Sequence, residues 1–376
     1  MGRSLRVVVP ILAPLLLFGV PWLSLVLAPD WPAAGFVTGT VVFAAALLAL
    51  PALMVLGHGP RQSDAAARTG DALLGVVWVL FTWSVLGQLV RLVLVLSGVD
   101  DPAGPVAVTT AVVAAALLVT GNRAAMRVPP VREVDVVVPR IGPGIDGLKI
   151  AVVTDTHFGP LDRTKWSERV VAAVNGLGAD VVCHAGDLAD GSVARRRKQV
   201  DPLAGVHAAL GRFYITGNHE YFGEAQAWLD HMAGLGWDTL HNRSTLVERG
   251  GDRIVFAGID DPTGAGSGLP GHGPDLPAAL DGVPSEVPVV LLAHQPKQVT
   301  EAAEAGIDLQ ISGHTHGGQI WPFHLLVRLD QPTLGGLSRH GERTQLYNSR
   351  GTGFWGPPFR VFAPSEITLL TLRRSV

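Results

Sequence analysis

Residue types that bind metal ions occur in five short polar clusters between residues 150 and 320. Carboxylate, imidazole and amide oxygen together suit one or two divalent cations such as manganese, iron or zinc, and Cys183 is the only thiol in the chain. The sequence therefore predicts a metal site without a thiolate cluster. The five clusters are Asp155-Thr156-His157, Gly186-Asp187-Leu188-Ala189-Asp190, Gly217-Asn218-His219-Glu220, His294, and Gly313-His314-Thr315-His316-Gly317.

The spacing within two clusters suits shared coordination. Asp155 and His157 are two residues apart, so on an extended backbone both side chains project to the same side, and His314 and His316 repeat this spacing. With Asp187 shared between two cations, the set divides into two groups of four and leaves room for water and a substrate oxygen. Water between two cations loses its proton near neutral pH, and the same cations offset charge on an attacked phosphoryl group.

Each cluster follows a short apolar run rich in β-branched residues, which is typical of a buried strand. In open α/β sheets, loops that leave the carboxyl ends of the strands converge on one edge. We therefore expect the five clusters to meet in space. The predicted strands are residues 148–154, 181–183, 213–216, 287–293 and 309–312.

The ordered motifs Asp-x-His, Gly-Asp-x-x-Asp, Gly-Asn-His-Glu, His and Gly-His-x-His resemble those of the calcineurin-like metallophosphoesterase superfamily, over roughly residues 134–376. The resemblance implies that His219 protonates the leaving oxygen or stabilises the charged transition state, and that Asp190 orients a ligand or His219. It implies a first ion held by Asp155, His157, Asp187 and His316, and a second held by Asp187, Asn218, His294 and His314.

Composition divides the chain into two parts. At 376 residues, with a mean hydropathy of +0.32 and 16% charged residues, the chain is too apolar for an ordinary soluble protein and long enough for two domains. The net charge of -3 argues against a nucleic-acid-binding protein. One cysteine excludes an intrachain disulfide framework, and Cys183 is interpreted as a core residue.

Four apolar segments precede residue 122 and approach or exceed the roughly 20 residues that cross a bilayer as a helix. A secretory signal peptide is the competing interpretation of the first, but its apolar run is long and further segments follow. We predict a transmembrane region of about four spans over residues 1–122. The segments are residues 7–28, 35–56, 72–98 and 105–120, of which the last is the shortest.

The distribution of basic residues predicts the orientation of these spans. Arginines flank the amino terminus, the loop between the second and third segments, and the end of the fourth, whereas the other two loops carry Asp30, Asp100 and Asp101 without Lys or Arg. An even number of spans then puts both termini and the remainder of the chain on the cytoplasmic side. The protein is therefore expected in the cell membrane as a multi-pass protein.

The rest of the chain alternates predicted strands with helix-like stretches such as 165–176 and 225–235, which favours an α/β sandwich of mixed β-sheets flanked by helices. Residues 123–133 are the predicted linker, because paired prolines stop a helix there, and residues 134–376 form the predicted catalytic domain. Residues 134–138 and 366–372 are the expected opening and closing strands.

Two groups of polar residues outside the motifs each have two interpretations. Gln88 and Arg91 lie inside the third apolar segment, where Arg91 either has a function or extends its charge towards the outer interface. The basic run from Arg195 to Lys198 is either a solvated helix face or a contact with anionic lipid headgroups. Both alternatives stay open at this point.

The chain becomes apolar after the last predicted ligand, with Trp321 and Trp355 in stretches rich in Gly and Pro. These side chains belong either to the core or to an apolar rim beside the metal site. This tail is similar to the membrane-associated bacterial phosphodiesterase branch of the superfamily, some members of which act on lipid-linked pyrophosphates.

These observations lead to one functional prediction and two alternatives. The prediction is a membrane-bound phosphoesterase with two divalent metal ions, manganese first and iron or zinc as alternatives. It would hydrolyse phosphodiester or pyrophosphate bonds by attack of a metal-bound hydroxide, with a lipid-linked substrate as one hypothesis. No protein partner is predicted. The alternatives are a phosphatase for soluble nucleotides or phosphoproteins, and a membrane sensor or scaffold that uses the fold for binding.

Overall fold

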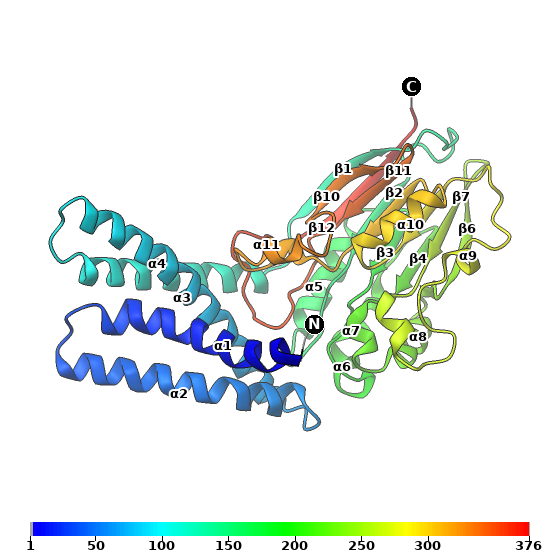
Figure 1. The fold of residues 1–376 in the computed structure, drawn as a ribbon. Helices are drawn as coiled ribbons and strands as arrows, with labels where there is room; N and C mark the ends of the chain where they lie inside the picture. The colour runs from blue at the N-terminus through cyan, green and yellow to red at the C-terminus, as the bar shows by residue number, and fades with distance from the viewer. Residues whose placement is uncertain (1–2, 376) are drawn as a thin grey trace. The chain divides into compact units, whose positions relative to one another are not determined.

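The computed structural model describes residues 3–375, with side chains from Leu12 onward. The chain forms two compact units. The helical unit comprises the residues up to Ala124 together with Ile320–Pro322 and Gly356–Val361, and the sandwich unit comprises Ala125–Gln319, Phe323–Trp355 and the residues from Phe362 onward. Figure 1 shows the elements of both units.

Four helices form the helical unit: α1 (Arg3–Trp22), α2 (Ala33–His58), α3 (Asp64–Leu96) and α4 (Ala103–Met126). Each predicted apolar segment is therefore helical, and the fourth extends well beyond the expected 105–120. Within the described residues, α2, α3 and α4 are long and apolar enough to cross a membrane. The described part of the first segment adds a shorter apolar stretch, Leu12–Leu27, which includes a π-helical turn at Leu23–Leu27.

The helices pack around a small apolar core and expose large aliphatic side chains on the outside. Phe18, Leu50 and Val77 form part of this core, whereas Leu48 and Leu96 are 76% and 78% exposed. An outer surface of this kind suits lipid rather than water.

Polar side chains inside the helical unit contact one another. Gln88 Nε2 donates a hydrogen bond to Ser24 Oγ at 2.8 Å, and Arg91 Nη1 donates to Gln88 Oε1 at 3.5 Å. Arg91 therefore contacts Gln88 of its own helix, and Gln88 links α3 to the turn after α1.

Two distant segments belong to the helical unit rather than to the sandwich. Ile320, Phe359 and Val361 join an apolar cluster with side chains of α3 and α4. The rings of Trp321 and Trp83 lie 6.2 Å apart, and the Arg360 amide donates to Gly121 O at 3.0 Å. For this part of the predicted apolar rim, the structure therefore favours the core interpretation.

The sandwich unit contains two mixed six-stranded sheets, as the alternation of elements predicted. The first has the order β1-β12-β2-β3-β4-β5 and the second β10-β11-β9-β8-β7-β6. Their bounds are β1 Val131–Val137, β2 Lys149–Val153, β3 Val181–Ala185, β4 Gly211–Ile215, β5 Asp238–Thr239, β6 Arg243–Arg249, β7 Asp252–Gly258, β8 Val289–Leu292, β9 Leu309–Ser312, β10 Gly336–His340, β11 Thr344–Asn348 and β12 Ile367–Arg373.

The apolar core lies between the facing sides of the sheets, and helices cover their outer sides. Alternation along β2 divides its side chains, because Ile150 and Val152 enter the core between the sheets while Ala151 and Val153 face the helices. The helices that pack on the outer sides are α5 Thr164–Asn175, α6 Val193–Val200 and α8 Ala225–Gly234 on the first sheet, and α9 Leu276–Ala279 and α10 Val299–Glu304 on the second. Two further short helices of this unit are α7 Asn218–Tyr221 and α11 His324–Val327.

The connection between α4 and β1 is shorter than the predicted linker of residues 123–133. Helix α4 continues to Met126, and β1 begins at Val131. The helix persists because Pro129 and Pro130, which cannot continue it, come only after Met126. The four residues 127–130 are thus the only part of the predicted linker outside these two elements.

Candidate metal centre

The structure brings all nine predicted site residues together at the carboxyl ends of five parallel strands. Strand β2 leads to Asp155 and His157, β3 to Asp187 and Asp190, β4 to Asn218 and His219, β8 to His294, and β9 to His314 and His316. Strands β2, β3 and β4 run parallel in one sheet, and β8 and β9 run parallel in the other. Both sheets therefore contribute to one site.

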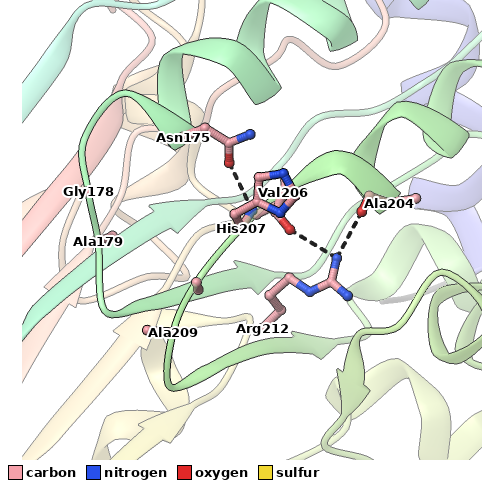
Figure 2. Close-up of a pocket in the computed structure, with 9 residues that line it drawn as sticks. Asn175, Gly178, Ala179, Ala204, Val206, His207, Ala209 and Arg212 are labelled. Atoms are coloured by element: carbon pink, nitrogen blue, oxygen red, sulfur yellow. Dashed lines mark hydrogen bonds between the residues drawn. The ribbon is translucent and has the colours of Figure 1, made fainter.

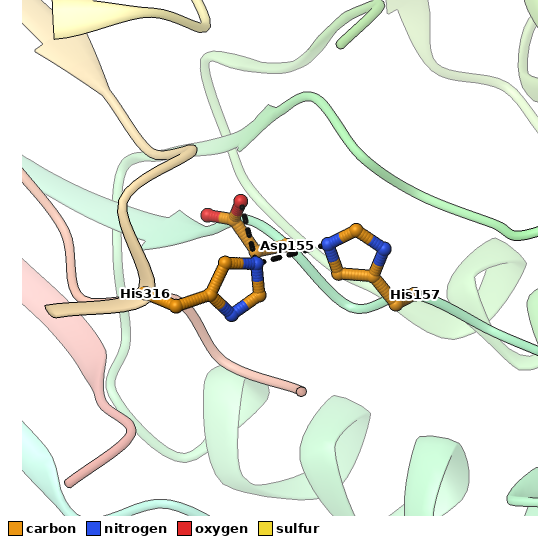
Figure 3. Close-up of side chains that lie close together, drawn as sticks. All are labelled: Asp155, His157 and His316. Atoms are coloured by element: carbon orange, nitrogen blue, oxygen red, sulfur yellow. Dashed lines mark hydrogen bonds and ion pairs between the residues drawn. The ribbon is translucent and has the colours of Figure 1, made fainter. Parts of the chain in front are cut away.

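The first group of side chains contains Asp155, His157 and His316 (Figure 3). The Nε2 atoms of the two histidines lie 3.0 Å apart, and His316 Nε2 lies 3.4 Å from Asp155 Oδ1. All three residues are buried, with exposed fractions of 5% or less. Two imidazole nitrogens and a carboxylate oxygen that face one another in this way are a suitable ligand set for a divalent cation.

The second group contains Asp187, Asn218, His294 and His314. His294 Nε2 lies 3.1 Å from Asp187 Oδ2, and His314 Nδ1 lies 2.9 Å from Asn218 Oδ1. The same Asp187 Oδ2 is 3.5 Å from His157 Nε2 of the first group. Asp187 therefore lies between the two groups and reaches both.

Two buried polar atoms at this edge make no hydrogen bond within the protein. They are Asp155 Oδ2 and His294 Nε2, and both residues are fully buried. Asp155 Oδ2 is thus left without a partner, which costs on the order of 1–3 kcal/mol, and His294 Nε2 has only the 3.1 Å contact with Asp187 Oδ2 described above. Cations bound between the two groups would satisfy both atoms, so the residues present fit a pair of divalent ions.

The backbone at the ligands adopts a conformation that side chains disfavour. Positive φ angles occur at Asp155 (54°), His157 (43°), Asp187 (50°), His314 (71°) and His316 (50°). Each costs on the order of 1 kcal/mol or more for a residue other than glycine. A fold that accepts this strain at five neighbouring positions is positioning these side chains for a function other than stability.

Asp190 links the first group to His219. Asp190 Oδ1 lies 2.7 Å from His219 Nδ1 and 2.9 Å from His157 Nδ1. Burial lowers the pKa of His219, but the carboxylates of Asp187 and Asp190 outweigh it and raise this pKa to about 9. The imidazole is therefore held in one orientation and favours its protonated form at neutral pH.

The surroundings shift the pKa values of the two histidines of the second group in opposite directions. Burial lowers the pKa of His294, but the carboxylates of Asp187 and Asp155 raise it well above its usual range. Burial and the neighbouring His294 lower the pKa of His314 to about 3. The neutral imidazole of His314 is the form that binds a metal.

Glu220 has a supporting role that the sequence interpretation did not assign, although it belongs to the Gly-Asn-His-Glu motif. Its fully buried carboxylate accepts hydrogen bonds from the amides of Asp187, Leu188, Ala189 and Gly217, at 2.6–3.2 Å. Burial and the charge of Asp187 raise the pKa of Glu220 to about 8. Glu220 thus fixes the loop that presents Asp187.

The basic run in α6 has two kinds of residue. Arg196 is 5% exposed, and its Nε donates to the Asp190 carbonyl oxygen at 2.9 Å. Arg195, Arg197 and Lys198 are exposed. The run is therefore neither a uniformly solvated face nor a uniform lipid contact, because Arg196 supports the backbone of a site residue.

Two exposed aromatic side chains lie beside His219. The rings of Phe222 and Trp355 are 5.2 Å and 6.1 Å from the His219 ring, and these residues are 70% and 45% exposed. Gln319 fixes Trp355, because its Nε2 donates to Trp355 O at 2.7 Å and its Oε1 accepts from the Trp355 amide at 2.9 Å. Sequence reasoning identified Trp355 but not Phe222, which carries no motif signal.

A separate surface depression contains none of the site residues (Figure 2). Its polar groups are used within the protein: Asn175 Oδ1 accepts from the His207 amide at 2.8 Å, and Arg212 Nη1 donates to the Ala204 and Val206 carbonyls. The depression therefore offers few groups for chemistry.

Comparisons with known proteins agree with the geometry of the site. The family model described as calcineurin-like phosphoesterase matches residues 148–318. A transmembrane protein with metallophosphoesterase domain from Danio rerio is 37% identical over 316 residues, which cover 80% of this chain and 72% of that protein. A protein of the same description from Bos taurus is 38% identical over 282 residues, covering 72% of this chain and 62% of that protein. An uncharacterized metallophosphoesterase of Campylobacter jejuni is 32% identical over 340 residues, covering 88% of each chain.

Proposed function

This chain belongs to the calcineurin-like phosphoesterase family, and on that premise we propose that it is a membrane-embedded hydrolase of phosphodiester or pyrophosphate bonds that uses two metal ions. The observation that carries the proposal is the position of the buried Asp187 between the two groups of candidate ligands. A carboxylate placed in this way suits a bridge between two cations 3.5–4 Å apart, the usual separation in two-metal hydrolases.

The proposed ligands follow the two groups. The first cation is assigned to Asp155, His157, Asp187 and His316, and the second to Asp187, Asn218, His294 and His314. Their nitrogen and oxygen donors suit manganese, with iron or zinc as alternatives. When bound, the two ions would lower the pKa of a coordinated water and offset charge on the phosphoryl group.

His219 is the proposed general acid. Its Nδ1 is occupied by Asp190 at 2.7 Å, so Nε2 is the nitrogen that remains to donate a proton to the leaving oxygen. Asp190 acts as a positioning residue, because it fixes the ring of His219 and that of the ligand His157 at the same time.

We assign the substrate to phosphoesters with an apolar group, including lipid-linked ones. Phe222 and Trp355 flank His219, where the leaving group would lie, and both are exposed. The apolar helices support attachment to a membrane, so a lipid phosphoester would reach the site at high effective concentration. Basic residues occur at the amino terminus, between the second and third apolar segments, and after the fourth. This distribution supports a cytoplasmic position for the catalytic part of the chain.

Activity of the purified full-length chain with manganese tests the proposed reaction. The assay compares a lipid pyrophosphate, a small soluble phosphodiester, a nucleotide monoester and a phosphopeptide. The proposal expects turnover of diester or pyrophosphate bonds above that of the monoesters. A preference for soluble monoesters would instead favour the phosphatase alternative, and no turnover of any class with full metal content would favour a sensor or scaffold.

Trp355→Ala tests the apolar rim. This change should lower kcat/KM for a lipid phosphodiester by about 10-fold, because it removes apolar contact worth on the order of 1.5–3 kcal/mol when fully buried. Turnover of a small soluble diester should change little. Trp31→Ala is the matched control, since Trp31 is also partly exposed, at 37%, but lies in the turn before α2. Equal losses on both substrates would contradict the rim.

A further inference from the structure

A second group of metal-binding side chains lies outside the proposed catalytic site. His241 follows β5, Asp260 follows β7, and His272 lies in the loop before α9. One ligand atom from each lies within 4.8 Å of the other two. Three separate segments of the sandwich unit therefore present two imidazoles and a carboxylate to one point.

The distances suit a tetrahedral ion. Asp260 Oδ1 lies 2.7 Å from His241 Nδ1, and Asp260 Oδ2 lies 3.8 Å from His272 Nδ1. Ligands of a tetrahedral zinc ion, each about 2.0 Å from the metal, are roughly 3.3 Å from one another. The two distances, which involve the two different oxygens of Asp260, lie on either side of this value, and a zinc ion would replace the proton that His241 Nδ1 donates to Asp260.

The hydrogen bonds of His272 leave the correct nitrogen for a metal. His272 Nε2 lies 3.0 Å from Gln226 Oε1, an atom that only accepts, so Nε2 carries the proton. The lone pair is then on Nδ1, which faces Asp260 and lies 3.1 Å from the Tyr221 hydroxyl. An outer partner that fixes the tautomer is a regular feature of histidine ligands, and the Tyr221 hydroxyl is a fourth oxygen nearby.

The charge of Asp260 calls for a cation. Asp260 is 1% exposed, and the adjacent Asp261 is fully buried. Across residues 12–375, the Asp260 carboxylate contacts His241 and His272 but no Lys or Arg, and it accepts hydrogen bonds from His241 Nδ1 at 2.7 Å and from the Gly273 amide at 3.0 Å. A buried carboxylate needs a positive partner, and within these residues the imidazole of His241 is the one group placed to supply it. By contrast, the His231–Asp201 pair on the surface has side chains that are 20% and 51% exposed, so water solvates that charge.

We propose that His241, Asp260 and His272 bind one Zn²⁺ ion, separate from the two catalytic cations. Two nitrogen ligands and one or two oxygen ligands match the donors of non-thiolate zinc sites. The ion would join the turn after β5 to the loop before α9. Through Tyr221 it would also contact the end of α7, which is the helix that contains Asn218 and His219.

The experiment counts zinc in the full-length chain, solubilised in detergent, stripped of metal and dialysed against micromolar zinc. Wild type should hold about one equivalent more than His272→Gln and His241→Gln, because each variant removes one of three protein ligands. Ions at the catalytic edge cancel in this difference. His231→Gln is the matched control and should hold the same zinc as wild type.

A second measurement distinguishes loss of the zinc site from loss of folding in the variants. Zinc added to the stripped protein after the catalytic site has been filled with manganese should raise the melting temperature of wild type and of His231→Gln, but not of His272→Gln or His241→Gln. Equal zinc content in wild type and both variants would overturn the proposal and leave a hydrogen-bonded His–Asp network. A wild type whose melting temperature ignores this zinc would also overturn it.

Discussion

The helical unit and the sandwich unit both bury an apolar core, but they differ in what they expose and in where they gather polar groups. In the helical unit, large aliphatic side chains such as Leu48 and Leu96 cover the outside, and polar groups such as Ser24 and Gln88 bond to one another inside. In the sandwich unit, aliphatic side chains fill the space between the sheets, and buried carboxylates and imidazoles gather at one edge. Each surface matches a different environment, lipid for the first and cations for the second.

The two units also differ in their backbone geometry at the places where polar groups are buried. Unpartnered polar atoms and positive φ angles occur together at the ligand edge, for example at Asp155, where bound cations would offset their cost. The helical unit is built mainly of long α-helices, whose backbone hydrogen bonds form within each helix, as a membrane requires. Variants that affect only one unit should therefore have separable effects.

The largest effect is expected from Asp187→Asn. The amide retains the shape of the side chain but removes the charge that faces both ligand groups, so turnover should fall by more than about 10³-fold and metal content should drop. Rates and metal analysis of the same preparation provide the measurement. Asp201→Asn, in an exposed pair, should leave both unchanged. Retained turnover with full metal occupancy would refute a shared carboxylate.

A smaller effect is expected from His219→Ala. If His219 donates a proton and is not a ligand, the variant should keep both metal ions and lose about 10²–10⁴-fold in rate, the usual contribution of a general acid. His207→Ala, at an exposed position, is the control. Loss of metal from His219→Ala would reassign this residue as a ligand.

Asp190→Asn should have a more moderate effect with a distinct pH signature. A positioning residue typically contributes about 10–100-fold. If His219 is the general acid, its protonated form is the active one, so activity should be present below its pKa and lost as the pH rises through that value. Against burial, Asp187 and Asp190 raise this pKa to about 9, so removing the charge of Asp190 lowers it.

The basic limb of the pH–rate profile should therefore move to lower pH in Asp190→Asn. Asp162→Asn removes an exposed carboxylate that pairs with Lys198 and should leave the limb in place. An unmoved limb in Asp190→Asn, with the rate reduced, would show that His219 is not the group that titrates.

The last variants test membrane topology and are expected to have no effect on the rate. In a Cys183→Ala background, Asp100→Cys should react with an impermeant thiol reagent on intact cells, while Asp281→Cys in the sandwich unit should not. Both positions are exposed, and neither change should alter turnover. Labelling of Asp281→Cys from outside would reverse the proposed cytoplasmic orientation.

The sequence predicted the strands well, and with them the edge at which the candidate ligands gather, because both depend on local patterns. Apolar runs that end in Asp, His or Asn identified β2, β3, β4, β8 and β9 to within a few residues. The predicted helices at 165–176 and 225–235 correspond to α5 and α8. Short-range periodicity and motif order were sufficient for these elements.

Features that depend on contacts between distant residues could not be predicted in this way. Nothing local shows that Phe359 packs among the helices, or that Arg196 is buried against Asp190 within an otherwise exposed basic run. The partners of Glu220 lie about thirty residues away along the chain. His241 and His272 have no motif, because loop geometry alone brings them to Asp260.

Electron paramagnetic resonance of the manganese-loaded, full-length protein tests the central claim most directly. Two manganese ions that share the Asp187 carboxylate should be magnetically coupled and give a multiline spectrum, which should disappear in Asp187→Asn. The wild-type protein would contradict the account if it bound two manganese ions and showed only the six-line signal of isolated ions.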